Sequence, residues 1–167
     1  MVEIRRATLK DRKGIYHVQT RAIEETCRAD YSLEQVQAWS SSLRPDDYTE
    51  VIRSREFIVA RDKRAVVGFG QLDLTRGHIE AVYVLPACQR RGIGSAILTH
   101  LERAARKAGY RKLTLSSTLN ALPFYKHAGF VELRPGERRL PNGMSLPCVD
   151  MEKNLAEDSD GQKNTPA

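Results

Sequence analysis

The segment of this 167-residue chain that most directly suggests chemistry is Gln89-Arg90-Arg91-Gly92-Ile93-Gly94. Gly92 and Gly94 carry no Cβ, so the main chain there can come close to a bulky anion. Where a helix begins at such a point, its unpaired amides and partial positive charge favour a phosphate group. We interpret the segment as a main-chain phosphate cradle. A tight strand-to-helix turn is the purely structural alternative.

This cradle differs from the common nucleotide loops. It lacks both the Lys-Ser/Thr ending of a triphosphate loop and the three-glycine pattern of a dinucleotide site. The net charge of +6 and the basic residues between positions 89 and 112 indicate a polyanionic partner, for which nucleic acid and a phosphorylated cofactor both qualify. No basic run with interleaved aromatic residues and no zinc spacing is present, which makes nucleic acid the less favoured partner.

A second pair of chemically active residues precedes the cradle. Glu80 interrupts an otherwise apolar strand pattern, and His78 projects to the same nominal face two residues earlier. A carboxylate in a covered strand needs a partner, a cavity or a raised pKa. The two residues are therefore either a general base with its orienting neighbour or a buried ion pair.

The cradle requires a strand before it and a helix after it, and the sequence predicts both. Segments 56–60, 65–74 and 78–85 are rich in Val, Ile and Phe and predict an antiparallel meander. Apolar residues at helical spacing predict a helix from Ile93 to about Gly109. Further helices are expected at 9–29, 33–43 and 121–127, and further strands at 2–4, 112–115, 130–133 and 146–153. This order predicts a mixed α/β sheet.

The composition limits the class of protein. With 41% hydrophobic residues the chain is long enough for one domain, which we place at residues 1–154, followed by an acidic tail at 155–167 that we expect to be disordered. The mean hydropathy of -0.48 and the short apolar stretches argue against a membrane protein. No secretory signal is recognisable, so we expect a cytoplasmic protein. Three widely spaced cysteines fit neither a disulfide framework nor a metal site.

Two stretches resemble the motifs of the GNAT superfamily of N-acetyltransferases. Residues 82–98, which contain the cradle, are similar to its acetyl-CoA-binding motif, and residues 120–130 (Asn-Ala-Leu-Pro-Phe-Tyr-Lys-His-Ala-Gly-Phe) to its second motif. Residues 29–39 and 78–80 are most similar to the YafP-like branch. The resemblance spans residues 2–153, with both motifs in the expected order and spacing.

The resemblance implies a largely antiparallel mixed sheet of about seven strands, splayed in the middle and flanked by about four helices. It also implies acetyl-CoA as co-substrate, with no metal. In that family the main chain at Tyr83 and Val84 would pair with the pantetheine arm, and the amides of residues 89–94 would bind the pyrophosphate. The expected cofactor-binding residues are Tyr83, Val84, Gln89, Arg90, Arg91, Gly92, Ile93, Gly94, Ser95, Asn120, Phe124 and Lys126.

Acetyl transfer from a thioester to an amine requires removal of a proton from the amine and delivery of one to the sulfur. The resemblance implies Tyr125 as the general acid, although the YafP-like branch often has phenylalanine there. Glu80 is our predicted general base, with His78 or water as alternatives. A main-chain N–H near Val84 is expected to stabilise the oxyanion. Asn120 could contact the cofactor or only cap the next helix.

Tyr31, Trp39 and His78 are the predicted acceptor contacts, with helix packing as the alternative for the two aromatic residues. We therefore expect an N-acetyltransferase acting on a primary amine. A catalytically silent acetyl-CoA-binding module is the alternative. A homodimer is compatible with the sequence, which does not specify the acceptor.

Overall fold

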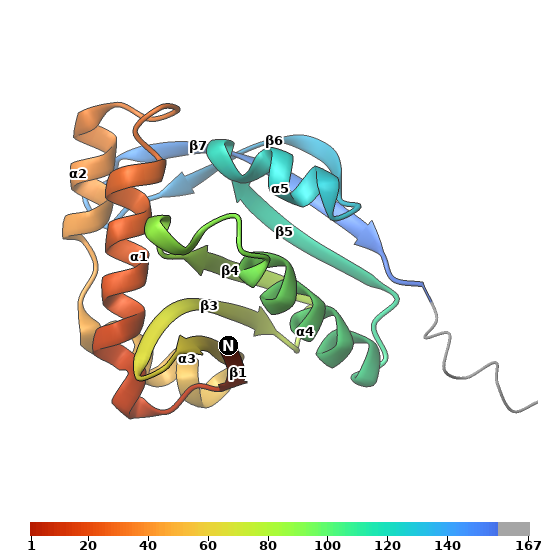
Figure 1. Ribbon diagram of the computed structural model, residues 1–167. Coiled ribbons are helices and arrows are strands. Elements are labelled where there is room, and N and C mark those ends of the chain that lie inside the picture. The colour runs from red at the N-terminus through yellow and green to blue at the C-terminus, as the bar shows by residue number, and fades with distance from the viewer. Residues whose placement is uncertain (157–167) are drawn as a thin grey trace, which may run out of the picture.

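One open, seven-stranded sheet organises residues 1–156, which are the residues that the computed structural model describes (Figure 1). The strands lie in the order β1-β2-β3-β4-β5-β7-β6. Their bounds are β1 Val2–Arg6, β2 Glu56–Asp62, β3 Ala65–Asp73, β4 His78–Val84, β5 Lys112–Thr118, β6 Val131–Arg139 and β7 Ser145–Asn154. All neighbours are antiparallel except β4 and β5, which are parallel. The predicted mixed, largely antiparallel sheet is confirmed.

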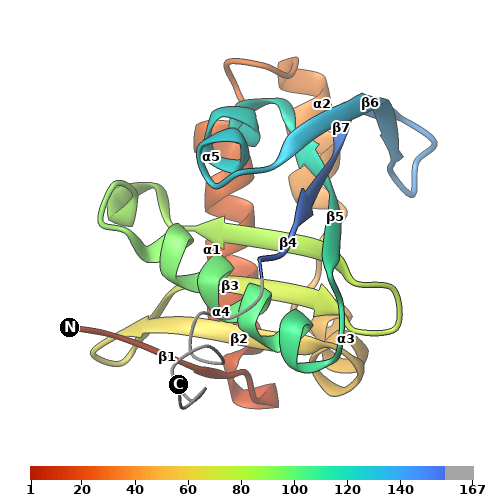
Figure 2. The ribbon, with the colours of Figure 1, turned by 90° about the vertical axis from the view of Figure 1, so that its right-hand side faces the viewer.

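Helices cover both faces of the sheet (Figure 2). The bounds are α1 Arg12–Thr26, α2 Leu33–Ser41 and α3 Tyr48–Ser54 on one face, and α4 Ile93–Lys107 and α5 Leu122–His127 on the other. Sequence patterns predicted all of these except α3. That helix has only seven residues and follows Pro45 without a side-chain cap, so it offers little periodicity to detect. Within residues 1–156, no helix combines the length and the apolar character needed to cross a membrane.

The C-terminal strand ends in contact with the rest of the fold. The amide of Leu155 donates to the carbonyl of Arg111 at 2.8 Å, and its side chain packs against the core. The predicted disordered tail otherwise lies outside the described residues from position 157 onward.

Helix α4 lies unusually close to β3, and two glycines make this approach possible. A Cβ at Gly70 would lie 2.5 Å from Cγ2 of Ile97 and 3.0 Å from Cδ1 of Leu101, and a Cβ at Gly68 would lie 3.0 Å from Cδ1 of Ile97. Ile97 and Leu101 are fully buried in this contact. The packing of α4 on β3 therefore fixes where the N-terminal end of α4 points, which is toward the end of β4.

The parallel pair β4–β5 separates soon after it forms. The paired residues are His78 with Thr114 and Ile79 with Leu115, and within the described sheet no later residue of β4 is paired with β5. A β-bulge leaves Glu80 without an opposite residue on β3, since Ile79 faces Leu72 and Ala81 faces Gln71. Figure 1 shows the two strands diverging toward α1. The predicted splay of the central strands is confirmed.

We predict that Gly70→Ala destabilises the protein by about 1–3 kcal/mol, because the new methyl overpacks the contact with α4. The measurement is the free energy of unfolding by urea. Ile97→Ala removes the atom that the methyl would strike, so the double variant should lose less stability than the sum of the two single variants. Strict additivity would contradict the close approach of α4.

Candidate functional site

The space between the diverging strands opens into a cavity of about 570 Å³, here called the larger cavity. Its wall combines the end of β4, the start of α4, the segment after β5, and Ala22 and Thr26 of α1. It contains most of the predicted cofactor-binding residues: Tyr83, Val84, Gln89, Arg90, Gly92, Ile93, Gly94, Ser95, Asn120 and Phe124. The residues of the predicted phosphate cradle therefore lie in the wall of the larger cavity.

The cradle has the expected main-chain geometry. Gly92 is the N-cap of α4 with φ of 78°, a left-handed conformation that favours glycine. The first helical hydrogen bond runs from the amide of Ala96 to the carbonyl of Gly92 at 3.0 Å. The amides of residues 93–95 therefore have no acceptor within the helix and are available to an anion.

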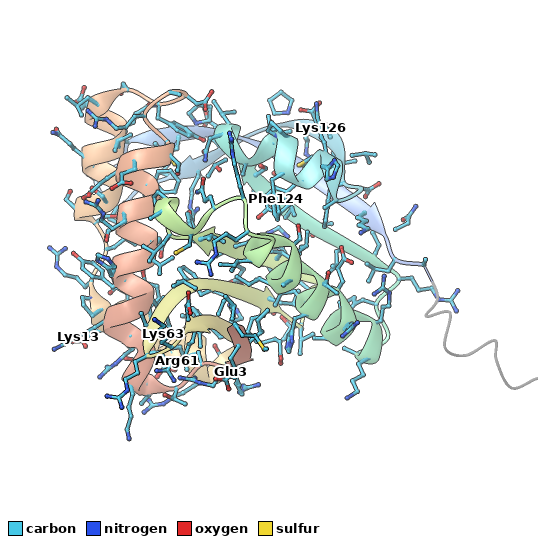
Figure 3. All side chains as sticks on the ribbon, in the orientation of Figure 1. Glu3, Lys13, Arg61, Lys63, Phe124 and Lys126 are labelled. Carbon is cyan, nitrogen blue, oxygen red and sulfur yellow. The ribbon has the colours of Figure 1, made fainter. Side chains whose placement is uncertain are left out.

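The two cradle glycines have different roles. A Cβ at Gly92 would meet no atom within 4 Å, so only its backbone conformation requires glycine. A Cβ at Gly94 would lie 3.3 Å from the ring of Phe124, so this glycine allows α4 and α5 to come close. Phe124 belongs to α5, and its side chain lies between α5 and α4 (Figure 3). Arg90 also has a positive φ, 63°, which its residue type did not predict.

Two predicted cofactor-binding side chains do not line the larger cavity. Arg91 is paired with Asp62 at 3.2 Å, and Lys126 is paired with Glu132 at 3.2 Å. Figure 3 shows Lys126 at the outer end of α5, away from the cradle. Both side chains thus have carboxylate partners on the surface.

Tyr125 is also absent from the cavity wall. Its side chain is 6% exposed, and its ring packs against Phe124 and Phe130 at centroid distances of 5.0 and 5.7 Å. Burial raises the pKa of its phenol. Within residues 1–156 no hydrogen bond of its hydroxyl is present, so its proton is not committed to another protein group.

A second cavity of about 290 Å³, here called the smaller cavity, lies beside the first. It brings together all the predicted acceptor contacts and the predicted base: Tyr31, Trp39, His78 and Glu80. Thr118, the last residue of β5, lines both cavities. Two sites of different size therefore meet at one residue where β4 and β5 diverge.

An ion pair between Glu80 and His78 was the structural alternative to a general base, and no such pair is present among residues 1–156. The Glu80 carboxylate accepts hydrogen bonds from Nε of Arg55 at 3.0 Å and from the Gln71 amide, and Arg76 lies 3.6 Å away. The bulge at Glu80 directs this carboxylate toward the end of α3, where Arg55 lies.

His78 instead makes a 2.7 Å hydrogen bond between Nδ1 and Oγ1 of Thr114. Burial, assisted by the charge of Arg76, lowers the pKa of His78, so its imidazole is neutral at pH 7.

Tyr31 and Asn120 have packing contacts as well as cavity positions. The Tyr31 hydroxyl donates to the carbonyl of Pro147 at 2.5 Å and accepts from the amide of Leu119 at 3.2 Å. Asn120 Oδ1 accepts from the Cys27 thiol at 3.4 Å, and no side chain caps α5. Tyr31 therefore joins the loop after α1 to β7, and Asn120 does not have the capping role.

Sequence reasoning missed the residues that reach the cavities from remote elements. Arg138 of β6 lines the smaller cavity with its guanidinium 5.7 Å from the centre of the Trp39 ring. Burial raises the pKa of the Tyr83 phenol, and the neighbouring Arg138 guanidinium opposes that shift. In the sequence, Arg138 belongs to a charged run typical of a solvated hairpin, and nothing there signals a role.

The described residues 1–156 contain no group of three His, Cys, Asp or Glu side chains that could hold a metal ion. Cys88 lines the larger cavity as an isolated thiol.

Comparison with known proteins identifies the family to which this chain belongs. The model of the acetyltransferase (GNAT) domain matches residues 27–155. YafP of Escherichia coli, an uncharacterised N-acetyltransferase, is 26% identical over 77% of this chain and 81% of its own length. YjcF of Bacillus subtilis, also an uncharacterised N-acetyltransferase, is 31% identical over 51% of this chain, and the match spans 62% of YjcF.

Solved structures agree with this assignment. A GCN5-related N-acetyltransferase from Rhodopseudomonas palustris has a TM-score of 0.86 and 27% identity, covering 92% of this chain and 95% of that one. PaiA N-acetyltransferase from Thermoplasma acidophilum, solved with coenzyme A, has the same fold, with a TM-score of 0.76 and 20% identity. The match covers 92% of this chain and 99% of PaiA. The chain therefore belongs to the GNAT family of acetyltransferases, enzymes that use acetyl-CoA as the acetyl donor.

Proposed function

We propose that this protein transfers the acetyl group of acetyl-CoA directly to a primary amine bound in the smaller cavity. The observation that carries the proposal is that two cavities meet at Thr118, where β4 and β5 diverge. A donor in one cavity and an acceptor in the other would bring thioester and amine together at this point. Direct attack in such an arrangement needs no acyl-enzyme intermediate.

The larger cavity is proposed to bind the donor. The amides of residues 93–95 would hold the pyrophosphate, and the free edge of β4 at Tyr83 and Val84 would hydrogen-bond the pantetheine arm like an added strand. A main-chain N–H near Val84 would stabilise the oxyanion. These contacts use main-chain donors and require no metal.

Proton transfer is assigned to one residue near each reacting atom. Glu80 would take the proton of the amine, directly or through water, because its carboxylate lines the smaller cavity. Neutral His78 lines the same cavity and is the alternative base. Tyr125 would protonate the departing sulfur, since its buried phenol retains a proton with no other acceptor among residues 1–156.

The deciding experiment measures thiol release from acetyl-CoA with a panel of primary amines, with the acetylated product identified by mass spectrometry. Amine-dependent thiol release supports the transferase. Tight acetyl-CoA binding without release for any amine would favour the alternative, a binding module without turnover. Cytoplasmic location, a homodimer and the absence of a nucleic-acid partner stay predictions.

We predict that Gly92→Ala weakens acetyl-CoA binding by at least about tenfold, the effect of losing roughly one charge-assisted hydrogen bond, because alanine disfavours the φ that the cradle needs. Gly109→Ala is the matched control. Gly109 lies at the other end of α4, also has a positive φ of 92°, and also has open space around its Cβ position. Calorimetry should give similar stability losses for both variants but weaker binding only for Gly92→Ala. Equal affinities would remove the cradle from the binding site.

We predict that Glu80→Gln lowers turnover most at neutral pH, with recovery as rising pH deprotonates the amine in solution. The control is Asp73→Asn, because Asp73 binds the same two arginines, Arg55 and Arg76, without lining either cavity. Rate against pH and the thermal midpoint are measured for both variants. If the two variants have the same pH profile, Glu80 acts through the arginine network, and His78 becomes the base to test.

We predict that Tyr125→Phe keeps acetyl-CoA affinity and lowers turnover about tenfold to a thousandfold, the range expected for one positioned proton donor. The measurement combines steady-state rates with single-turnover rates, so that the chemical step is observed. An undiminished chemical step would exclude Tyr125. Tyr83, which lines the larger cavity, would then be the next donor to test.

A further inference from the structure

The charges that line the smaller cavity are not all compensated. Arg76 is held by Asp73 at 2.9 Å and lies 3.6 Å from Glu80, which is in turn held by Arg55. Arg138 differs, since no carboxylate within residues 1–156 forms an ion pair with it. The cavity therefore presents one guanidinium that has no anion from the described chain, together with one carboxylate, that of Glu137, that has no ion-pair partner among residues 1–156.

Arg138 is exposed as a residue, but its guanidinium lies in the wall of the smaller cavity. It lies 5.7 Å from the centre of the Trp39 ring, a cation–π arrangement, and beside the phenol of Tyr83. Its strand position is fixed because Arg138 faces Leu146 in the β6–β7 register, and Leu146 is buried in the same cavity wall. A planar guanidinium held in this way loses little side-chain freedom when it forms two parallel hydrogen bonds.

We propose that the acceptor is a small amino acid, whose carboxylate binds Arg138 while its amine points toward Thr118. This inference rests on the proposed acetyl transfer and names the class of substrate for the same site. It would make Arg138 a specificity-determining residue in a position that the family motifs do not include.

The surroundings favour a carboxylate over a doubly charged phosphate. Among residues 1–156, only one uncompensated cation lines this cavity, the carboxylate of Glu137 lies in the same wall, and no helix start with free amides lines it. The carboxylates of Asp73, Glu80 and Asp150 all lie near enough to His78 to act on its charge, so a dianion in the same space would meet repulsion. The volume of about 290 Å³ is at the small end for ligand sites and suits a single amino acid.

The test compares matched amines: alanine, its carboxamide and ethylamine, with glycine and β-alanine to vary size and the spacing of the two charged groups. The carboxamide has the less basic amine, so a preference for the acid cannot arise from a larger unprotonated fraction. We expect the amino acid preferred by the wild type to have a kcat/KM about tenfold to a hundredfold above that of its carboxamide. Arg138→Gln should abolish this preference, mainly through KM.

Arg139→Gln is the matched control. It removes the same charge from the next residue of β6, which is exposed and lines neither cavity, and it should keep the preference. Acetyl-CoA affinity should be unchanged in both variants, which verifies that they are folded. A second readout needs no turnover: Trp39 is the chain's single tryptophan, so its fluorescence should respond to the amino acid in the wild type and not in Arg138→Gln.

The outcomes separate the two proposals. Acetylation of amines with no preference for the carboxylate, or a preference that survives in Arg138→Gln, overturns the amino acid assignment and leaves the acetyl transfer intact. Absence of thiol release with every amine, together with no fluorescence response to any amino acid, overturns both. A fluorescence response that depends on Arg138 without thiol release supports the binding site and counts against transfer.

Discussion

Strand β4 is paired with β5 at His78 and Ile79, and beyond Ile79 the two strands diverge, so that this edge of β4 has no neighbouring strand in the described sheet. Strand edges normally satisfy their N–H and C=O groups through a neighbouring strand, and an unpaired edge inside a protein requires water or a ligand. Here the unpaired edge leads directly to the N-terminal end of α4, whose first amides are also without acceptors. The two sets of unsatisfied groups lie in one cavity, so a ligand with a long polar arm and a phosphate group would satisfy both.

The bulge at Glu80 connects this divergence to the opposite side of the sheet. One extra residue in β4 turns the carboxylate toward Arg55, which ends α3, and toward Arg76 in the β3–β4 turn. Asp73 binds the same two arginines. The short helix α3 and the turn are thereby fixed relative to the smaller cavity by charged hydrogen bonds, which have narrower geometric requirements than apolar packing. This network explains how a carboxylate is accommodated in a strand that the sequence marks as apolar.

Sequence patterns predicted the parts of the structure that depend on local order. The meander, α4 and the cradle follow from periodicity and from glycines placed between a strand and a helix, and each is confirmed or lies in the larger cavity. The alternative of a Glu80–His78 ion pair does not hold, because a bulge at Glu80 breaks the alternation of the strand and directs the carboxylate to Arg55. Arg138 and Thr118 could not be found, because their proximity to Trp39 and to both cavities depends on strands distant in sequence. The left-handed conformation of Arg90 has no signal in its residue type.

The single residue shared by the two cavities has a kinetic consequence for the proposed reaction. Among residues 1–156 the walls have only Thr118 in common, so a donor in one cavity would leave the other open to an acceptor. Such an enzyme forms a ternary complex before chemistry, so double-reciprocal plots at several fixed concentrations of the second substrate intersect. Parallel lines would belong to a covalent acetyl-enzyme, for which the isolated thiol of Cys88 is the sole nucleophilic sulfur in the larger cavity wall as described. Intersecting lines would therefore agree with two separate cavities, and parallel lines would not.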